Sequence, residues 1–210
     1  MKKYNFDIEH QFLYHANTQR FEKFLNHYEL LKLSKNVKGS IVELGVFKGS
    51  SLIRLAHYRD LLKIKKKIYG FDTFKLFPKN KSNFLYDKKF PKKFEDYAGR
   101  PIELDKLKEI LKSKKIKKVT LIKGNIYQTL NFFDKKNIKI SFLHLDLDTE
   151  NITLYALKKL YKKIEKGGIV VFDDYNIHKG INRAVKKFFV KKTNIRKPLF
   201  GINPHFVIKT

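Results

Sequence analysis

The chain has 210 residues, of which 42% are hydrophobic and 14% aromatic, so it is long enough to fold around a core and is not expected to be disordered. It contains no cysteine, which excludes a disulfide framework and a thiolate metal site. No apolar run approaches the length of a membrane span, and the N-terminal residues lack the apolar segment of a signal peptide. We therefore expect a cytoplasmic protein.

The net charge of +27 favours a partner that carries negative charge, such as nucleic acid, an anionic membrane or an anionic substrate. Only six of the 47 basic residues are arginine, the side chain that binds phosphates and bases with two parallel hydrogen bonds. The lysines are spread along the whole chain. We interpret the charge chiefly as a property of composition, and specific nucleic-acid binding is not expected.

Strand-like and helix-like segments alternate after a helical N-terminal segment at 1–39. Strand-like runs lie at 40–44, 67–72, 118–124, 139–148, 167–174, 198–202 and 205–210. Helix-like segments lie at 50–64, 102–114, 126–136, 151–166 and 179–191. The first five runs are continuously apolar, as in parallel strands covered on both faces, and the last two are too close together for a crossover helix. We expect one α/β domain over 40–210, a doubly wound Rossmann-like sheet of seven strands with helices on both faces and a C-terminal antiparallel hairpin.

One connection, residues 73–117, is longer than a compact domain normally needs. Seven aromatic residues fall between residues 74 and 97 of this segment. Because aromatic side chains pack rather than remain in solvent, we expect the segment to fold over a site as a lid.

Acidic residues stand where apolar strands end, at the edge of the sheet where open parallel sheets bind ligands. They are Asp72, Asp146, Asp148, Asp173 and Asp174. The strands that end at Asp146 and Asp173 should be neighbours, so three or four carboxylates come together and need a cation between them. Oxygen ligands alone favour Mg²⁺ or a similar hard divalent ion.

Five blocks in order along the chain carry a resemblance to a known family: IVELGVFKGSS, IYGFDTF, KGNIYQTL, LDLDTENITLYALKKLYKKIEKGGIVVFDDY and KGINRAVKKFF. Together they resemble the class I S-adenosylmethionine-dependent methyltransferases. More closely, the chain resembles the macrocin O-methyltransferase family, whose members methylate sugar hydroxyls of antibiotics and bacterial glycans. The resemblance covers residues 18–190.

The resemblance implies a role for each matching residue. S-adenosylmethionine would be bound by Glu43, Gly45, Gly49, Ser50, Asp72, Gly124 and Asn125. Mg²⁺ would be held by Asp146, Asp173 and Asp174. Asp146 and Asp148 form a pair in which one acid binds the ion and the other accepts the proton, and the sequence does not divide these roles. His178 is a further candidate base, whereas His144 in mid-strand is expected to be a core histidine with its hydrogen bonds satisfied.

Departures from the family pattern fall mainly on the acceptor side, where Thr149 and Glu150 follow Asp148 in place of a variable residue and tyrosine. Asn125 also stands where the family usually has an acid. The sequence therefore predicts a small-molecule or glycan hydroxyl as acceptor without naming it, and it leaves the oligomeric state open, a homo-oligomer included.

Two alternatives stay open at this point. The charge favours an RNA or other nucleic-acid methyltransferase, although the Asn/Asp-Pro-Pro-aromatic block of base amino-methylases is absent. A basic nucleic-acid-binding module without activity would leave the strand-end acids unexplained.

Overall fold

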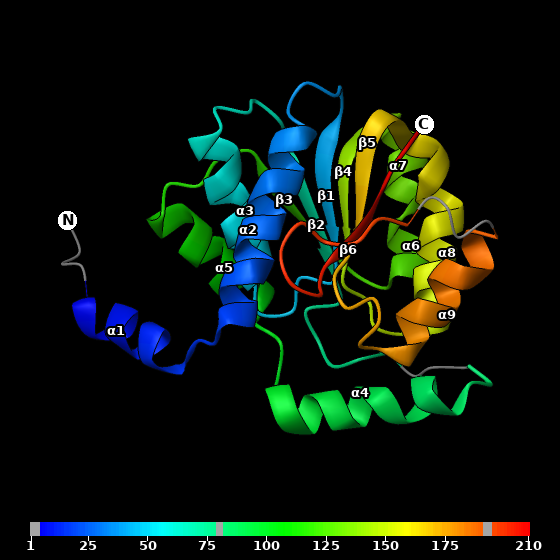
Figure 1. Ribbon diagram of the computed structural model, residues 1–210, viewed down its shortest axis with the longest axis horizontal. Coiled ribbons are helices and arrows are strands. Elements are labelled where there is room, and N and C mark those ends of the chain that lie inside the picture. Colours follow the sequence, from blue (N-terminus) through cyan, green and yellow to red (C-terminus); the bar gives the residue numbers. More distant parts are fainter. Residues whose placement is uncertain (1–4, 79–81, 191–194) are drawn as a thin grey trace.

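A computed structural model, which describes residues 5–78, 82–190 and 195–210, shows a six-stranded sheet between two layers of helices (Figure 1). The strands are β1 (Ser40–Leu44), β2 (Ile68–Asp72), β3 (Val119–Lys123), β4 (Ile140–Leu145), β5 (Ile164–Phe172) and β6 (His205–Ile208). Their order is β3-β2-β1-β4-β5-β6, and only β6 runs antiparallel to its neighbour. The expected α/β sheet is confirmed, and its order reverses between β1 and β4, where such sheets bind ligands.

Helices cover both faces of the sheet (Figure 1). One layer consists of α2 (Thr18–Leu33), α3 (Ser50–Leu61) and α5 (Leu104–Ser113); the other consists of α6 (Ile126–Thr129), α7 (Asn131–Lys136), α8 (Glu150–Leu160) and α9 (Lys179–Phe188). Helix α1 (Phe6–His15) extends away from the body and has no buried residue. Helix α4 (Leu85–Ala98) lies outside both layers. No helix in the described ranges is long and apolar enough to cross a membrane.

Alternate residues of the central strands pack against the two helix layers. Val42 and Leu143 pack into the cluster formed with α6 to α9, while Ile41 and Phe142 pack into the cluster formed with α2, α3 and α5. Because successive strand residues point to opposite faces, a strand covered on both faces is apolar along most of its length. This is why the strand runs in the sequence are continuous rather than alternating.

The expected seventh strand at 198–202 is wrong, and with it the hairpin of the last two runs. The segment turns instead, and the side chain of Asn26 in α2 satisfies its backbone: Nδ2 donates to the carbonyls of Phe200 and Asn203 at 2.7 and 2.9 Å, and Oδ1 accepts from the Leu199 and Phe200 N–H groups. Pro198 also removes one backbone donor. The final strand pairs with β5, and its other edge makes one isolated antiparallel bridge, between Phe206 and Arg196.

The boundary between the fourth helical segment and the next strand also differs from expectation. Helix α8 ends at Leu160, a 3₁₀ turn spans Tyr161–Lys163, and β5 begins at Ile164, which pairs with Ile140. Gly167 has a φ of 81° and lies inside β5, where the register against β4 shifts. The pair Gly167–Gly168 therefore marks an irregularity in the strand and not the end of a helix.

Candidate active site

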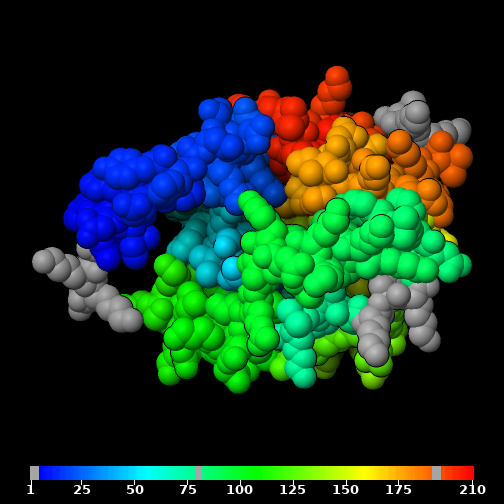
Figure 2. All heavy atoms as spheres, turned by 90° about the horizontal axis from the view of Figure 1, so that it is seen from below, coloured from blue at the N-terminus to red at the C-terminus, as the bar shows by residue number. Residues whose placement is uncertain are grey.

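A cavity of about 1060 Å³ lies at the carboxyl ends of β1, β2, β4 and β5. Helix α4 contributes to its wall, and in the view onto this side the green atoms that include α4 run across the molecule (Figure 2). The candidate site residues that line the cavity are Gly45, Ser50, Asp72, Asn125, Asp146, Asp148, Asp173, Asp174 and His178. Glu43, Gly49 and Gly124 are outside its lining.

The loop after β1 is shaped by glycine and by Asp72. Gly45 has a φ of 89°, and a Cβ at this position would lie 1.9 Å from the backbone oxygen of Asp146, so only glycine fits. The N–H groups of Val46 and Phe47 donate to Asp72 Oδ2 at 2.8 and 2.9 Å, and another backbone N–H donates to Oδ1 at 2.6 Å. Asp72 thus fixes the loop and has part of its lone-pair capacity left for a ligand hydroxyl.

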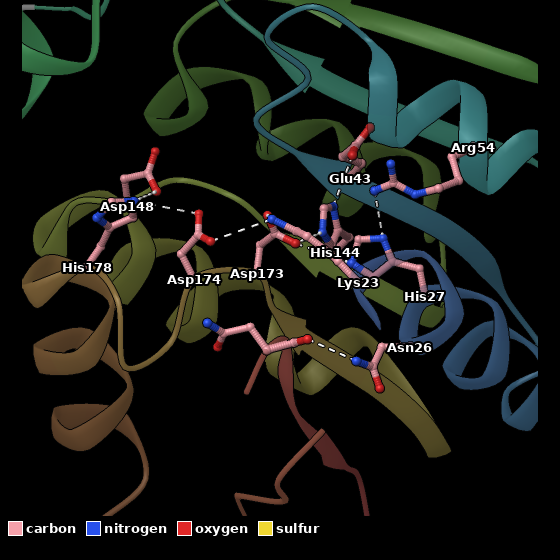
Figure 3. Close-up of polar contacts among 11 residues, drawn as sticks. Lys23, Asn26, His27, Glu43, Arg54, His144, Asp148, Asp173, Asp174 and His178 are labelled. Carbon is pink, nitrogen blue, oxygen red and sulfur yellow. Dashed lines mark hydrogen bonds and ion pairs between the residues drawn. The ribbon is translucent and has the colours of Figure 1, made fainter. Parts of the chain in front are cut away.

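Asp173, directly after β5, is the centre of a buried ionic network (Figure 3). Its Oδ1 accepts a hydrogen bond from His144 Nε2 at 3.0 Å, and its Oδ2 lies 2.5 Å from Lys23 Nζ. The other ring nitrogen of His144 lies 3.0 Å from Glu43 Oε1, on the residue opposite it in β1. The prediction of a satisfied core histidine at His144 is confirmed, and Glu43 binds it within the sheet.

The charges in this network follow from its geometry. Burial would lower the pKa of His144, but hydrogen bonds and charge interactions with Asp173 and Glu43 outweigh burial and raise the pKa to about 10. Burial would raise the pKa of Asp173, but Lys23 and the histidine rings lower it well below the usual range. At neutral pH Asp173 is therefore a carboxylate and His144 an imidazolium.

His27, on α2, faces the same carboxylate as a neutral ring. Burial lowers its pKa to about 3. The Arg54 guanidinium donates to His27 Nδ1 at 2.9 Å, which leaves the ring proton on Nε2. Nε2 lies 3.2 Å from Asp173 Oδ1 without the angle of a hydrogen bond. Helices α2 and α3 thus place one neutral ring, His27, and one cationic group, Arg54, beside the network, and Arg54 also lines the cavity.

The three remaining carboxylates are much less well compensated. Burial raises the pKa of Asp146, Asp148 and Asp174, and repulsion from neighbouring acids raises it further. Within 4 Å of them in the described part of the chain, the only lysine or arginine nitrogen is Lys23 Nζ, 3.6 Å from Asp174 Oδ1. We call Asp146, Asp148, Asp173 and Asp174 the acid cluster.

The acid cluster has the composition of a site for a hard cation. One oxygen each from Asp146, Asp173 and Asp174 lies within 4.8 Å of the others, and all three donors are carboxylates. His144 lies between Glu43 and Asp173, and among the described residues the four acids have one ammonium group within 4 Å, that of Lys23. A divalent ion would supply the missing positive charge, and oxygen ligands suit Mg²⁺ or a related ion.

A second group, Asp148, Asp174 and His178, lies beside the first. His178 Nε2 is 3.7 Å from Asp148 Oδ1 and 3.7 Å from Asp174 Oδ2. Its other ring nitrogen lies 2.9 Å from the Tyr86 hydroxyl on α4, and the ring of Phe90 packs edge-on at 4.8 Å. Burial lowers the pKa of His178, so the ring is neutral at pH 7. His178 therefore connects the acid cluster with α4.

Asp148 has an unusual backbone conformation. Its φ is 57°, and the Thr149 N–H donates to the Leu147 carbonyl at 2.6 Å across a three-residue turn. Gly180, in the first turn of α9, packs against this turn, because a Cβ there would lie 2.3 Å from the Asp148 oxygen. A left-handed aspartate held by such close packing is a strained arrangement of the kind found at functional sites.

Asp87 attaches α4 to the end of the acid-bearing strand. Its side chain is 0% exposed, and it accepts the Glu150 N–H at 3.1 and 2.9 Å and the Asn151 N–H at 3.4 Å. These are the first backbone donors of α8, whose own N-cap residue Thr149 makes no side-chain capping bond. A residue of α4 thus caps a helix of the core domain, and the negative charge also suits that end of the helix dipole.

Sequence patterns did not identify four residues of this site. Lys23 and His27 belong to the amphipathic N-terminal segment, which showed no relation to the strand ends. Tyr86 is one of several aromatics in the expected lid, and an excess of aromatics was the only available signal for it. No local pattern distinguishes Asp87 from other acidic residues on a helix.

Comparisons with known proteins concern the family and the fold of the whole chain. The family model of macrocin O-methyltransferase (TylF) matches residues 15–208. No curated protein matches the sequence. Among solved structures, the O-methyltransferase NovP aligns with a TM-score of 0.77 and 19% identity, over 90% of this chain and 80% of its own.

Two further structures share the fold. The calicheamicin methyltransferase CalS11 aligns with a TM-score of 0.77 and 22% identity, over 99% of this chain and 86% of its own. TomG from Streptomyces achromogenes aligns with a TM-score of 0.57 and 16% identity, over 93% and 82%. The family match extends over nearly the whole chain, from the last residue of α1 to the last strand. The chain belongs to the macrocin O-methyltransferase family and is a methyltransferase.

Proposed function

We propose that the protein transfers a methyl group from S-adenosylmethionine to a hydroxyl of a sugar, in a small molecule, glycan or natural product, with Mg²⁺ or a similar ion held by Asp146, Asp173 and Asp174. The observation that carries this proposal is the convergence of four carboxylates on one cavity at the point where the strand order reverses. A related structure is described as a TDP-rhamnose 3'-O-methyltransferase, and TomG was solved with S-adenosylmethionine. The first description, of CalS11, supports the acceptor class, and the second supports the donor.

The size of the cavity supports two ligands side by side. Its volume of about 1060 Å³ is at the upper end of the range of roughly 300–1,000 Å³ that is typical for a single small-molecule site. Gly45, Ser50, Asp72 and Asn125 lie on the proposed cofactor side. The acid cluster would face the sulfonium and the acceptor, and its negative charge attracts a positively charged donor.

We assign a proposed role to each acid from the groups that lie beside it. A bound divalent ion would supply stabilisation for the negative charge that develops on the acceptor oxygen. Asp148 belongs to the group with His178 and is the proposed proton acceptor, because its raised pKa makes it a better base than an ordinary carboxylate. His178 orients Asp148 while Tyr86 holds the other side of the ring.

Helix α4 is the proposed lid. It carries Tyr86 and Phe90, which contact His178, and Asp87, which attaches it to α8. A cover in this place would exclude water and hold the acceptor oxygen in line with the methyl group, about 3 Å away.

A thermal-shift experiment tests the proposal without knowledge of the acceptor. S-adenosylhomocysteine should stabilise the protein, by roughly 2.7 kcal/mol at a concentration 100 times the dissociation constant, and Mg²⁺ should add to the effect. Asp72→Asn should weaken the response to S-adenosylhomocysteine, while Asp96→Asn on the outer face of α4 should not. No response to S-adenosylhomocysteine would contradict the donor, and identical responses with Mg²⁺ and with EDTA would contradict the metal.

A nucleic-acid methyltransferase is the second candidate, because the net charge is +27. Salt-sensitive methylation of RNA that exceeds methylation of nucleotide sugars would favour it. Membership of a methyltransferase family leaves no support for a binding module without activity.

A further inference from the structure

Lys23 is placed among the oxygens that would hold the divalent ion. It lies near the middle of α2, its side chain is 20% exposed, and its Nζ is 2.5 Å from Asp173 Oδ2 and 3.6 Å from Asp174 Oδ1 (Figure 3). Asp173 and Asp174 also belong to the all-oxygen group with Asp146. The ammonium therefore faces two of the three carboxylates of that group.

The two oxygens of Asp173 have different partners. Oδ1 accepts the hydrogen bond from the His144 imidazolium inside the protein. Oδ2 is the oxygen on the Lys23 side, so it is the one that an incoming cation would have to share with the ammonium. Two cations on one carboxylate oxygen repel each other strongly where little water is present to screen them.

We propose that Lys23 is the resident counter-ion of the acid cluster and competes with the divalent ion for Asp173, so that metal binding displaces its ammonium. The inference rests on the proposed metal site and extends it. Lys23 compensates part of the negative charge of the acid cluster before the ion arrives and lowers the affinity of the site for the ion. Displacement changes the contacts of α2, the helix whose residues Arg20 and Lys23 both line the cavity, so ion loading and the conformation of the cavity wall are coupled.

The test is a direct measurement of Mn²⁺ binding by electron paramagnetic resonance on the full chain, with no cofactor or acceptor present. Lys23→Met should bind Mn²⁺ more tightly than the natural protein, within the range of about 5–150-fold that is typical for coupled sites. Arg20→Met is the matched control, since it removes one positive charge from the same helix and cavity but has no carboxylate partner among the described residues. Its affinity should change by less than about threefold, as expected for a screened charge.

Several results would overturn the inference. One is an equal Mn²⁺ affinity of Lys23→Met and the natural protein. The others are an increase in Mn²⁺ affinity for Arg20→Met as large as that for Lys23→Met, and no Mn²⁺ binding by any variant. S-adenosylhomocysteine binding, measured on the same samples, separates this failure from failure of the proposed function. Lys23→Gln provides a second variant of similar length if Lys23→Met unfolds.

A second readout follows the lysine itself. In the ¹⁵N spectrum of lysine side chains, the ion pair should protect the ammonium protons of Lys23 from exchange with water. Once Mg²⁺ saturates the site, the Lys23 signal should shift, or its protons should exchange rapidly with water. A signal unchanged at saturating Mg²⁺ would show that the lysine is not displaced.

Discussion

The attachment of α4 through Asp87 leads to a quantitative prediction. Asp87→Ala removes a buried carboxylate that accepts the first two backbone N–H groups of α8. Loss of an N-cap costs about 0.5–2 kcal/mol, and hydrogen bonds to a charged group contribute about 1.5–3 kcal/mol. We take about 2 kcal/mol as the loss for docking of α4, which is roughly a 30-fold shift of the docking equilibrium.

Hydrogen exchange measures this shift locally. The amides of α4 should exchange up to about 30-fold faster in Asp87→Ala, while those of β1 and β4, buried in the core, should change much less. Asp96→Asn is the matched control, because Asp96 lies on the same helix, is 66% exposed and pairs only with Lys92 at 3.6 Å among the described residues. Such a surface pair contributes about 0–1 kcal/mol.

Equal exchange of the α4 amides in Asp87→Ala and the natural protein would refute the reasoning. If Asp87→Ala fails to fold, Asp87→Asn keeps one acceptor oxygen and should show a smaller acceleration in the same helix.

Three further predictions concern the acid cluster. Asp146→Asn should raise the melting temperature of the metal-free protein at pH 7, since the raised pKa of Asp146 means that its ionised form opposes folding. Asp173→Asn should lower the melting temperature, because Asp173 has a lowered pKa and buried partners. Effects of the same sign in the two variants would contradict the charge assignment. The pKa of His144 rises from 6.5 to about 10 on folding, so its contribution to stability is complete below about pH 6.5 and is lost as the pH rises toward 10. The melting temperature of His144→Gln should therefore fall less between these pH values than that of the natural protein. An equal fall in both proteins would be inconsistent with an imidazolium. Because His178 orients Asp148, His178→Gln should reduce kcat by about 10²-fold, as expected when a reacting group is misplaced, and should leave S-adenosylhomocysteine affinity unchanged. Methyl-transfer rates and calorimetry measure the two quantities, and an unchanged kcat would show that His178 does not orient Asp148.

The sheet and one side of the site were predictable from sequence because both depend on local patterns. Strand-like runs placed six strands within a few residues of their observed positions, and the acids directly after three of those runs had to meet at one edge. The strand at 198–202 could not be judged in this way. Whether these residues form a strand depends on Asn26, which lies more than 170 residues away in sequence and binds their backbone.

The other side of the site consists of residues that reach it by tertiary packing. Lys23 and Asp87 lie on helices that cross the strand ends from different parts of the chain. Neither their residue type nor their spacing distinguishes them from the many other charged residues of this lysine-rich sequence. The left-handed conformation of Asp148 likewise depends on contact with Gly180 in α9, which has no signature around Asp148 itself.

Anomalous diffraction from crystals grown with MnCl₂ and S-adenosylhomocysteine tests the central claim most directly. We expect a manganese peak among Asp146, Asp173 and Asp174, with S-adenosylhomocysteine in the same cavity beside Gly45 and Asp72 and its sulfur directed toward the acid cluster. A manganese peak at another site, or S-adenosylhomocysteine bound away from this cavity, would contradict the account.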